Sequence, residues 1–77
     1  MTDLRAFTVK VQVKPKNIDF LNRVFEAYDH LAVVTTIDSK EGLLVIRGFG
    51  KVGTVRRILR GLPFPVTILA ESTAEEA

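Results

Sequence analysis

The residues with the clearest chemical pattern form one glycine-rich segment of the 77-residue chain, Gly48-Phe49-Gly50-Lys51-Val52-Gly53, which matches the pattern G-x-G-x-x-G. This segment follows an apolar run typical of a strand and precedes apolar residues at helical spacing, the context that a dinucleotide-binding turn requires. Free N–H groups at the start of a helix attract anions, and Lys51 would add positive charge. The sequence therefore predicts an anion contact through Gly48, Gly50, Lys51 and Gly53.

The predicted topology disfavours a complete dinucleotide site at these glycines. Such a site needs parallel strands inside a larger doubly wound sheet, whereas the chain predicts only four strands and places the strand before Gly48 in a hairpin. Glu71 follows at about the separation of a ribose-binding acid. A turn that packs a helix tightly explains the same glycines, so phosphate or nucleotide binding is an alternative function.

The segment Arg47-Gly48-Phe49-Gly50 also resembles part of the RNA-recognition-motif signature. In that motif, aromatic rings on the open face of the sheet stack against bases. Here Lys51 replaces the second aromatic residue, and Phe7 is expected on the buried face of the first strand. We therefore expect no nucleic-acid binding of this type.

Cysteine is absent from the sequence, and histidine occurs once, at His30. Disulfides, thiolate nucleophiles and thiolate metal sites are therefore excluded, and a pair of histidine ligands from one chain is impossible. No motif places a serine beside His30, which is expected to be a turn residue, and Glu26 and Asp38 stand on different elements. We therefore expect a non-enzymatic protein without a metal or a cofactor.

The charge of the chain is unevenly distributed. Eleven basic residues oppose nine acidic ones, for a net charge of +2, and three of the acidic residues lie in the last seven positions. The remaining body is basic and would attract an anionic ligand or partner, or the charge serves solubility alone. No apolar run is long enough to span a bilayer, and residues 1–14 lack the apolar segment of a signal peptide. We expect a cytoplasmic protein without membrane association.

Hydrophobic periodicity predicts six elements. Residues 7–14 alternate between apolar and polar side chains, which is typical of a strand with one buried face. Two stretches have apolar residues at helical spacing, one with Asn17 as its N-cap and one with Gly61 as its C-cap. Between them, Asp38 can cap a hairpin turn and Gly42 can supply a positive φ. The predicted elements are a strand at 7–14, a helix from 17 to about 29, strands at 31–37 and 43–49, a helix at 52–61 and a strand at 66–70.

The order of these elements is β-α-β-β-α-β. Right-handed crossovers then favour a four-stranded antiparallel sheet with the spatial order 4-1-3-2 and both helices on one face. This is a ferredoxin-like α+β two-layer sandwich. We expect residues 1–71 to form this single domain and residues 72–77 to form a disordered acidic tail.

The face of the predicted sheet away from the helices, called the open face below, carries apolar as well as basic residues. If the second strand buries Leu31, Val33 and Ile37, its remaining residues are exposed. The residues expected on the open face are Ala32, Val34, Thr36, Leu43, Val45, Arg47, Leu69, Lys10, Gln12 and Lys14. Because such surfaces and bare strand edges are usually covered, we expect a homodimer that forms through the open face or the edge of the second strand.

Part of the chain resembles a small bacterial family that is classified as a domain of unknown function. The resemblance covers residues 17–48 and is carried by Asp19-Phe20-Leu21, Glu26-Ala27-Tyr28-Asp29, Leu31-Ala32-Val33-Val34, Thr36, Asp38 and Gly42. It implies no activity and no functional residue for this chain.

The predicted fold is also similar to that of ACT domains. These domains bind amino acids or similar small ligands, usually at a dimer interface beside the first strand-helix loop. They commonly have a glycine in that loop, where this chain has Lys14-Pro15-Lys16-Asn17. The resemblance implies a non-enzymatic, ligand-binding or regulatory module, and a module that contacts only other proteins is a further alternative.

Overall fold

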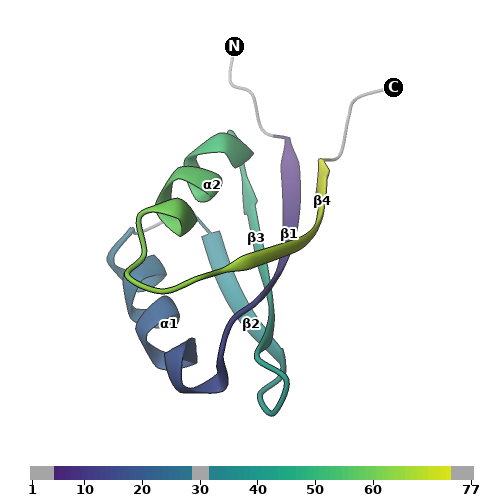
Figure 1. Ribbon diagram of the computed structural model, residues 1–77. Coiled ribbons are helices and arrows are strands. Elements are labelled where there is room, and N and C mark those ends of the chain that lie inside the picture. The colour runs from purple at the N-terminus through teal and green to yellow at the C-terminus, as the bar shows by residue number, and fades with distance from the viewer. Residues whose placement is uncertain (1–4, 29–31, 74–77) are drawn as a thin grey trace.

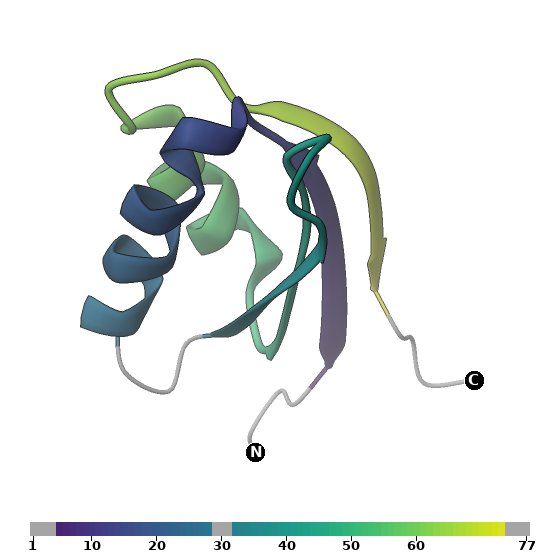
Figure 2. The ribbon, with the colours of Figure 1, turned by 90° about the horizontal axis from the view of Figure 1, so that it is seen from below.

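The computed structural model describes residues 5–28 and 32–73. The elements, in chain order, are β1 (Ala6–Gln12), a single 3-10 turn (Pro15–Asn17), α1 (Ile18–Ala27), β2 (Ala32–Asp38), β3 (Leu43–Phe49), α2 (Val52–Arg60) and β4 (Thr67–Thr73). The strands form one antiparallel sheet in the order β2-β3-β1-β4, and both helices lie on one face of it (Figures 1 and 2). This confirms the predicted ferredoxin-like α+β sandwich, because the order 4-1-3-2 is the same order counted from the other edge.

The central strand β1 supplies much of the core. Phe7, Val9 and Val11 face the helices and are at most 2% exposed. Val9 lies opposite Ile46 of β3 and Val11 lies opposite Leu44, so neighbouring strands bury side chains on the same face. The polar residues that alternate with them lie on the open face, as the period of two predicts.

Each helix buries a narrow apolar stripe against the sheet. Leu21 and Phe25 form the buried stripe of α1, and Val55 and Leu59 form that of α2. A spacing of four residues places both members of each pair on one helix face. Asn17 stands at the N-cap of α1 as predicted, but its side chain makes no capping hydrogen bond. Neither helix in the described ranges is long and apolar enough to cross a membrane.

The hairpin between β2 and β3 forms as its residue types predict. The Oδ1 atom of Asp38 accepts hydrogen bonds from the backbone N–H groups of Lys40 at 3.0 Å and Glu41 at 3.2 Å. Gly42 has a φ of 71°, and its carbonyl accepts a hydrogen bond from the N–H of Val13 at 2.9 Å. The hairpin is therefore joined to the end of β1.

The predicted orientation of β2 is wrong. Val33 and Ile37, which were expected inside, are 68% and 53% exposed, whereas Ala32 and Val34 pack against the core. The physical reason is the register, because Val34 lies opposite the buried Ile46 and pairing with β3 decides which side of β2 faces the helices. Both sides of β2 carry valine or threonine, so alternation within the strand could not decide between them.

The last strand, β4, begins one residue later than predicted and continues to Thr73, past the predicted domain boundary at residue 71. Its register against β1 shifts after Ile68, so that Leu69 is an extra residue and Ala70 lies opposite Lys10. This bulge places Ala70 on the open face, although the alternation predicts that it shares a face with Ile68.

The same bulge brings Glu71 to the helix-facing side of the sheet, opposite Val9. There the Nε atom of Arg56 donates to both carboxylate oxygens of Glu71, at 3.0 and 2.9 Å. This ion pair joins α2 to β4 and engages the carboxylate that the sequence pattern placed near a ribose.

Candidate functional site

The glycine-rich segment forms the turn between β3 and α2. Gly50 has a φ of 110°, and its N–H donates to the carbonyl oxygen of Arg5 at 2.8 Å. Lys51 is exposed at the N-cap of α2 and makes no side-chain capping bond. Gly53 is exposed in the first turn of α2, and Gly48 lies within β3 on the helix-facing side.

This turn brings Gly50, Lys51 and Gly53 together, and two of its backbone N–H groups already have acceptors. The N–H of Gly50 is bonded to Arg5, and the N–H of Thr54 donates to the carbonyl of Lys51 at 3.1 Å. A side-chain carbon at Gly50 or Gly53 would meet nothing within 4 Å, so close packing does not explain these glycines. The strand β1 also separates β3 from β4, so the adjacent parallel strands of a dinucleotide fold are missing here.

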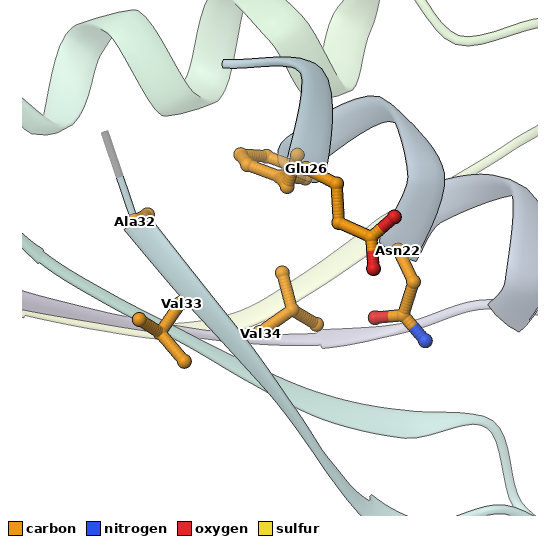
Figure 3. Close-up of a pocket in the computed structure, with 6 residues that line it drawn as sticks. Asn22, Glu26, Ala32, Val33 and Val34 are labelled. Atoms are coloured by element: carbon orange, nitrogen blue, oxygen red, sulfur yellow. The ribbon is translucent and has the colours of Figure 1, made fainter. Parts of the chain in front are cut away.

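A groove of about 270 Å³ lies between α1 and the edge strand β2. Asn22 and Glu26 of α1 form its polar wall, and Figure 3 shows the amide and the carboxylate next to each other on the side of α1 that faces β2. The apolar lining consists of the buried Phe25 with Ala32, Val33 and Val34. The groove therefore offers a carboxylate and an amide above an apolar floor.

The strand beside this groove has a bare edge. In the part of the chain that the structure describes, β3 is the only strand that flanks β2. Alternate backbone N–H and C=O groups of β2 therefore point outward without a strand partner in residues 5–28 and 32–73. Natural edges usually carry lysine, proline or a bulge; β2 has neither residue, and its register shifts only after Thr36. The residues 32–36 form a regular edge that another strand could pair with.

The first strand-helix loop, which the ACT resemblance indicates as a ligand loop, lines a different groove of about 420 Å³. This groove is lined by Lys14 and Pro15 together with Lys40 and Glu41 of the hairpin and Thr67 of β4. No residue of this groove also lines the groove beside β2. The loop thus lies away from the polar pair on α1.

The described residues assemble no metal centre, because no group of three or more histidine, cysteine, aspartate or glutamate side chains within 5–28 and 32–73 could hold a metal ion. The buried side chains of these ranges are all apolar. His30 and Leu31 lie outside the described residues.

Sequence reasoning did not identify Asn22 and Glu26 as a pair. Their spacing of four residues was a usable signal, since it places two side chains on one helix face. The missing information was the orientation of β2. With Val33 assigned to the interior, Ala32 and Val34 were expected to face away from α1, so no groove between β2 and α1 was expected.

The family model described as "Domain of unknown function (DUF4911)" matches residues 11–66. The chain belongs to this family. The DUF4911 match extends beyond the resemblance at residues 17–48 and includes the groove beside β2, the hairpin and all of α2. No curated protein and no solved structure matches the chain significantly.

Proposed function

We propose that this protein is a non-catalytic module that pairs with a second copy along β2 and binds a small amino-acid-like ligand in the groove beside that strand. The observation that carries the proposal is the juxtaposition of a bare, regular strand edge with a groove that contains Asn22 and Glu26. This ligand position differs from the one that the ACT resemblance implies, because the first strand-helix loop lines another groove.

Pairing along β2 is favoured by the residues of that edge. Antiparallel pairing of the two β2 strands about a twofold axis would give each outward N–H and C=O group a partner and keep the helices of both copies on one side of a continuous sheet. Exposed apolar residues lie on or near this strand, since Val33 is 68% and Ile37 is 53% exposed. Pairing would cover part of that surface and place α1 of each copy beside the groove of the other.

The groove fits the polar ends of an amino acid. The Glu26 carboxylate can pair with an ammonium group, and the Asn22 amide can donate to a carboxylate. A small apolar side chain would contact Val34 and Ala32. Since ligand pockets commonly enclose about 300–1,000 Å³, a groove of about 270 Å³ favours the smallest amino acids.

Cysteine cross-linking tests the pairing directly, because the chain contains no cysteine of its own. Val33→Cys, Thr35→Cys and an equimolar mixture of the two are oxidised with glutathione disulfide. Directly opposed residues of two antiparallel strands reach disulfide distance. If the twofold axis passes Thr35, two copies of Thr35→Cys oppose each other and cross-link. If it passes Val34, Val33→Cys of one copy opposes Thr35→Cys of the other, and only the mixture cross-links.

The matched control is Thr67→Cys, an exposed threonine on the opposite edge strand β4. The proposal predicts that it cross-links much more slowly than the β2 variants. Equal rates for all samples, together with a monomeric mass by light scattering at tens of micromolar, would rule out pairing along β2.

A thermal-shift series tests the ligand. Glycine, alanine, serine and valine are added separately, because a ligand at about 100 times its dissociation constant adds about 2.7 kcal/mol of stability. We expect the shift to disappear in Glu26→Gln and to persist in Glu41→Gln, an identical change at an exposed position in the hairpin. A shift given by inorganic phosphate alone, and lost in Lys51→Ala, would support the anion contact at the glycine-rich turn instead.

A further inference from the structure

Another groove lies between the two helices, away from β2. It has a volume of about 540 Å³. One wall is the α1 side, with Phe20, Val24 and Tyr28, and the other is the α2 side, with Thr54, Arg57 and Ile58. The connection from α2 to β4 contributes Gly61, Leu62 and Pro63 to the lining. The helices lie side by side on the sheet (Figure 2), and the groove occupies the space between their outer surfaces.

Two partly exposed aromatic side chains line the α1 side of the groove. Phe20 is 47% and Tyr28 is 49% exposed. The ring of Phe20 is held in place by an edge-on contact with Phe64, with ring centroids 5.5 Å apart and an interplanar angle of 85°. One wall of the groove is thus apolar, exposed and fixed by packing.

One charged side chain, that of Arg57, lines the groove. Arg57 is the only lysine, arginine, aspartate or glutamate among the residues that line the groove. Its neighbour Arg56 is paired with Glu71 at 2.9 Å, whereas Arg57 makes no ion pair with any residue in the described ranges. Thr54 and Tyr28 add hydroxyl groups to the lining.

We propose that the interhelical groove is a second binding site, which takes a small amphiphilic carboxylate with one apolar body and one anionic end. The apolar body lies against Phe20, Val24 and Ile58, and the carboxylate accepts hydrogen bonds from the guanidinium of Arg57. A planar guanidinium matches the two oxygens of a carboxylate. This site is independent of the groove beside β2 and shares no residue with it.

The size of the groove decides between a small molecule and a peptide helix. A volume of about 540 Å³ falls within the range of about 300–1,000 Å³ that is common for small-molecule sites. A helix docked in a groove needs several apolar anchors along more than two turns, whereas the α2 side of this groove carries a threonine and an arginine beside its one apolar residue, Ile58. The occupant that fits is therefore a compact ligand.

Hydrocinnamate, a phenyl ring joined to a carboxylate by a short chain, is the probe. Its binding to the full chain is followed by NMR titration of backbone amides. We expect saturable shifts concentrated in α1 and α2 around Phe20, Tyr28 and Ile58. Arg57→Gln should weaken binding about tenfold, the usual effect of losing a hydrogen bond to a charged group.

Three comparisons make the result specific. Arg60→Gln removes an exposed arginine of the same helix that does not line the groove, and it should bind as the unaltered chain does. Hydrocinnamide, the uncharged analogue, should bind the unaltered chain about as weakly as hydrocinnamate binds Arg57→Gln. Glu26→Gln should leave the affinity unchanged, which separates this site from the one beside β2.

Three results would overturn the proposal. The first is an absence of saturable shifts at millimolar hydrocinnamate, and the second is equal affinity for hydrocinnamate and hydrocinnamide. The third is a set of helix shifts that change on dilution without any ligand, which would show that the groove is a contact between protein chains.

Discussion

At the scale of single residues, Gly42 and Gly53 differ in whether the fold requires a glycine. Gly42 has a φ of 71° and an added side-chain carbon would overlap the carbonyl oxygen of Val13. Gly53 has no such φ and has open space where a side chain would go. The first glycine is required by geometry, and the second is not required by the fold.

Alanine at these two glycines should therefore change stability in opposite directions. Gly42→Ala should lower the free energy of unfolding by more than about 1–2 kcal/mol, because a side chain in the left-handed region is strained. Gly53→Ala should raise it by about 0.4–1 kcal/mol through reduced entropy of the unfolded chain. Urea unfolding followed by circular dichroism measures both, and shifts of the same sign would contradict this explanation.

The hairpin residues could be predicted from the sequence because their effects are local. The Asp38 carboxylate bonds to N–H groups two and three residues away, and the positive φ of Gly42 belongs to the same loop. The pair Asn22 and Glu26 could be placed on one face of α1 in the same way. Its function as the wall of a groove could not be predicted, because that depends on how a different element is oriented.

At the scale of elements, the strands β1 and β2 show what local pattern can and cannot decide. β1 has one apolar set and one polar set of side chains, so its buried face follows from alternation. β2 reads Ala-Val-Val-Thr-Thr-Ile-Asp, and both of its sides suit a sheet interior. Only pairing with β3 selects the side with Ala32 and Val34. The bulge at Leu69 is likewise a property of the β1–β4 pair and leaves no mark in the sequence of β4.

The orientation of β2 can be tested with two isosteric changes. Val34→Thr should lower the free energy of unfolding by about 1–2 kcal/mol, because it places a hydroxyl against the core. Val33→Thr, at a position 68% exposed, should stay within about 0.5 kcal/mol of the unaltered chain. Chemical unfolding at low protein concentration gives both values. The reverse order of the two effects would restore the orientation that alternation alone suggested.

The ion pair between α2 and β4 should contribute little and should depend on salt. The side chains of Arg56 and Glu71 are 42% and 28% exposed, and exposed pairs contribute about 0.2–1 kcal/mol. Glu71→Gln should lower the free energy of unfolding by about that amount in low salt. The difference should shrink at high ionic strength because screening weakens the pair, whereas a salt-independent loss would point to packing instead.

At the scale of the whole molecule, a chain of 77 residues has limited apolar surface to bury, and small domains are often marginal when alone. Most core residues come from β1, β3 and both helices, and no helix of the described ranges covers the open face of the sheet (Figure 2). Association along β2 would satisfy the bare backbone edge of that strand. The fold class and strand order could be predicted from the order of elements, because short crossovers of fixed handedness leave few arrangements.

Association should make thermal stability depend on protein concentration. A partner that binds only the folded state stabilises it by mass action, so a rise of about tenfold in protein concentration should raise Tm measurably. The double variant Val33→Lys with Thr35→Lys places charge along the edge and should remove the dependence. A Tm that is the same at all concentrations would indicate a monomer.

Hydrogen exchange at the backbone of β2 tests the central claim most directly. If two copies pair along this edge, the outward-pointing N–H groups of residues 32–36 are hydrogen-bonded in the dimer and exchange slowly at high protein concentration, and their protection falls on dilution while that of β1 does not. Rapid exchange of these amides at every concentration would contradict the account.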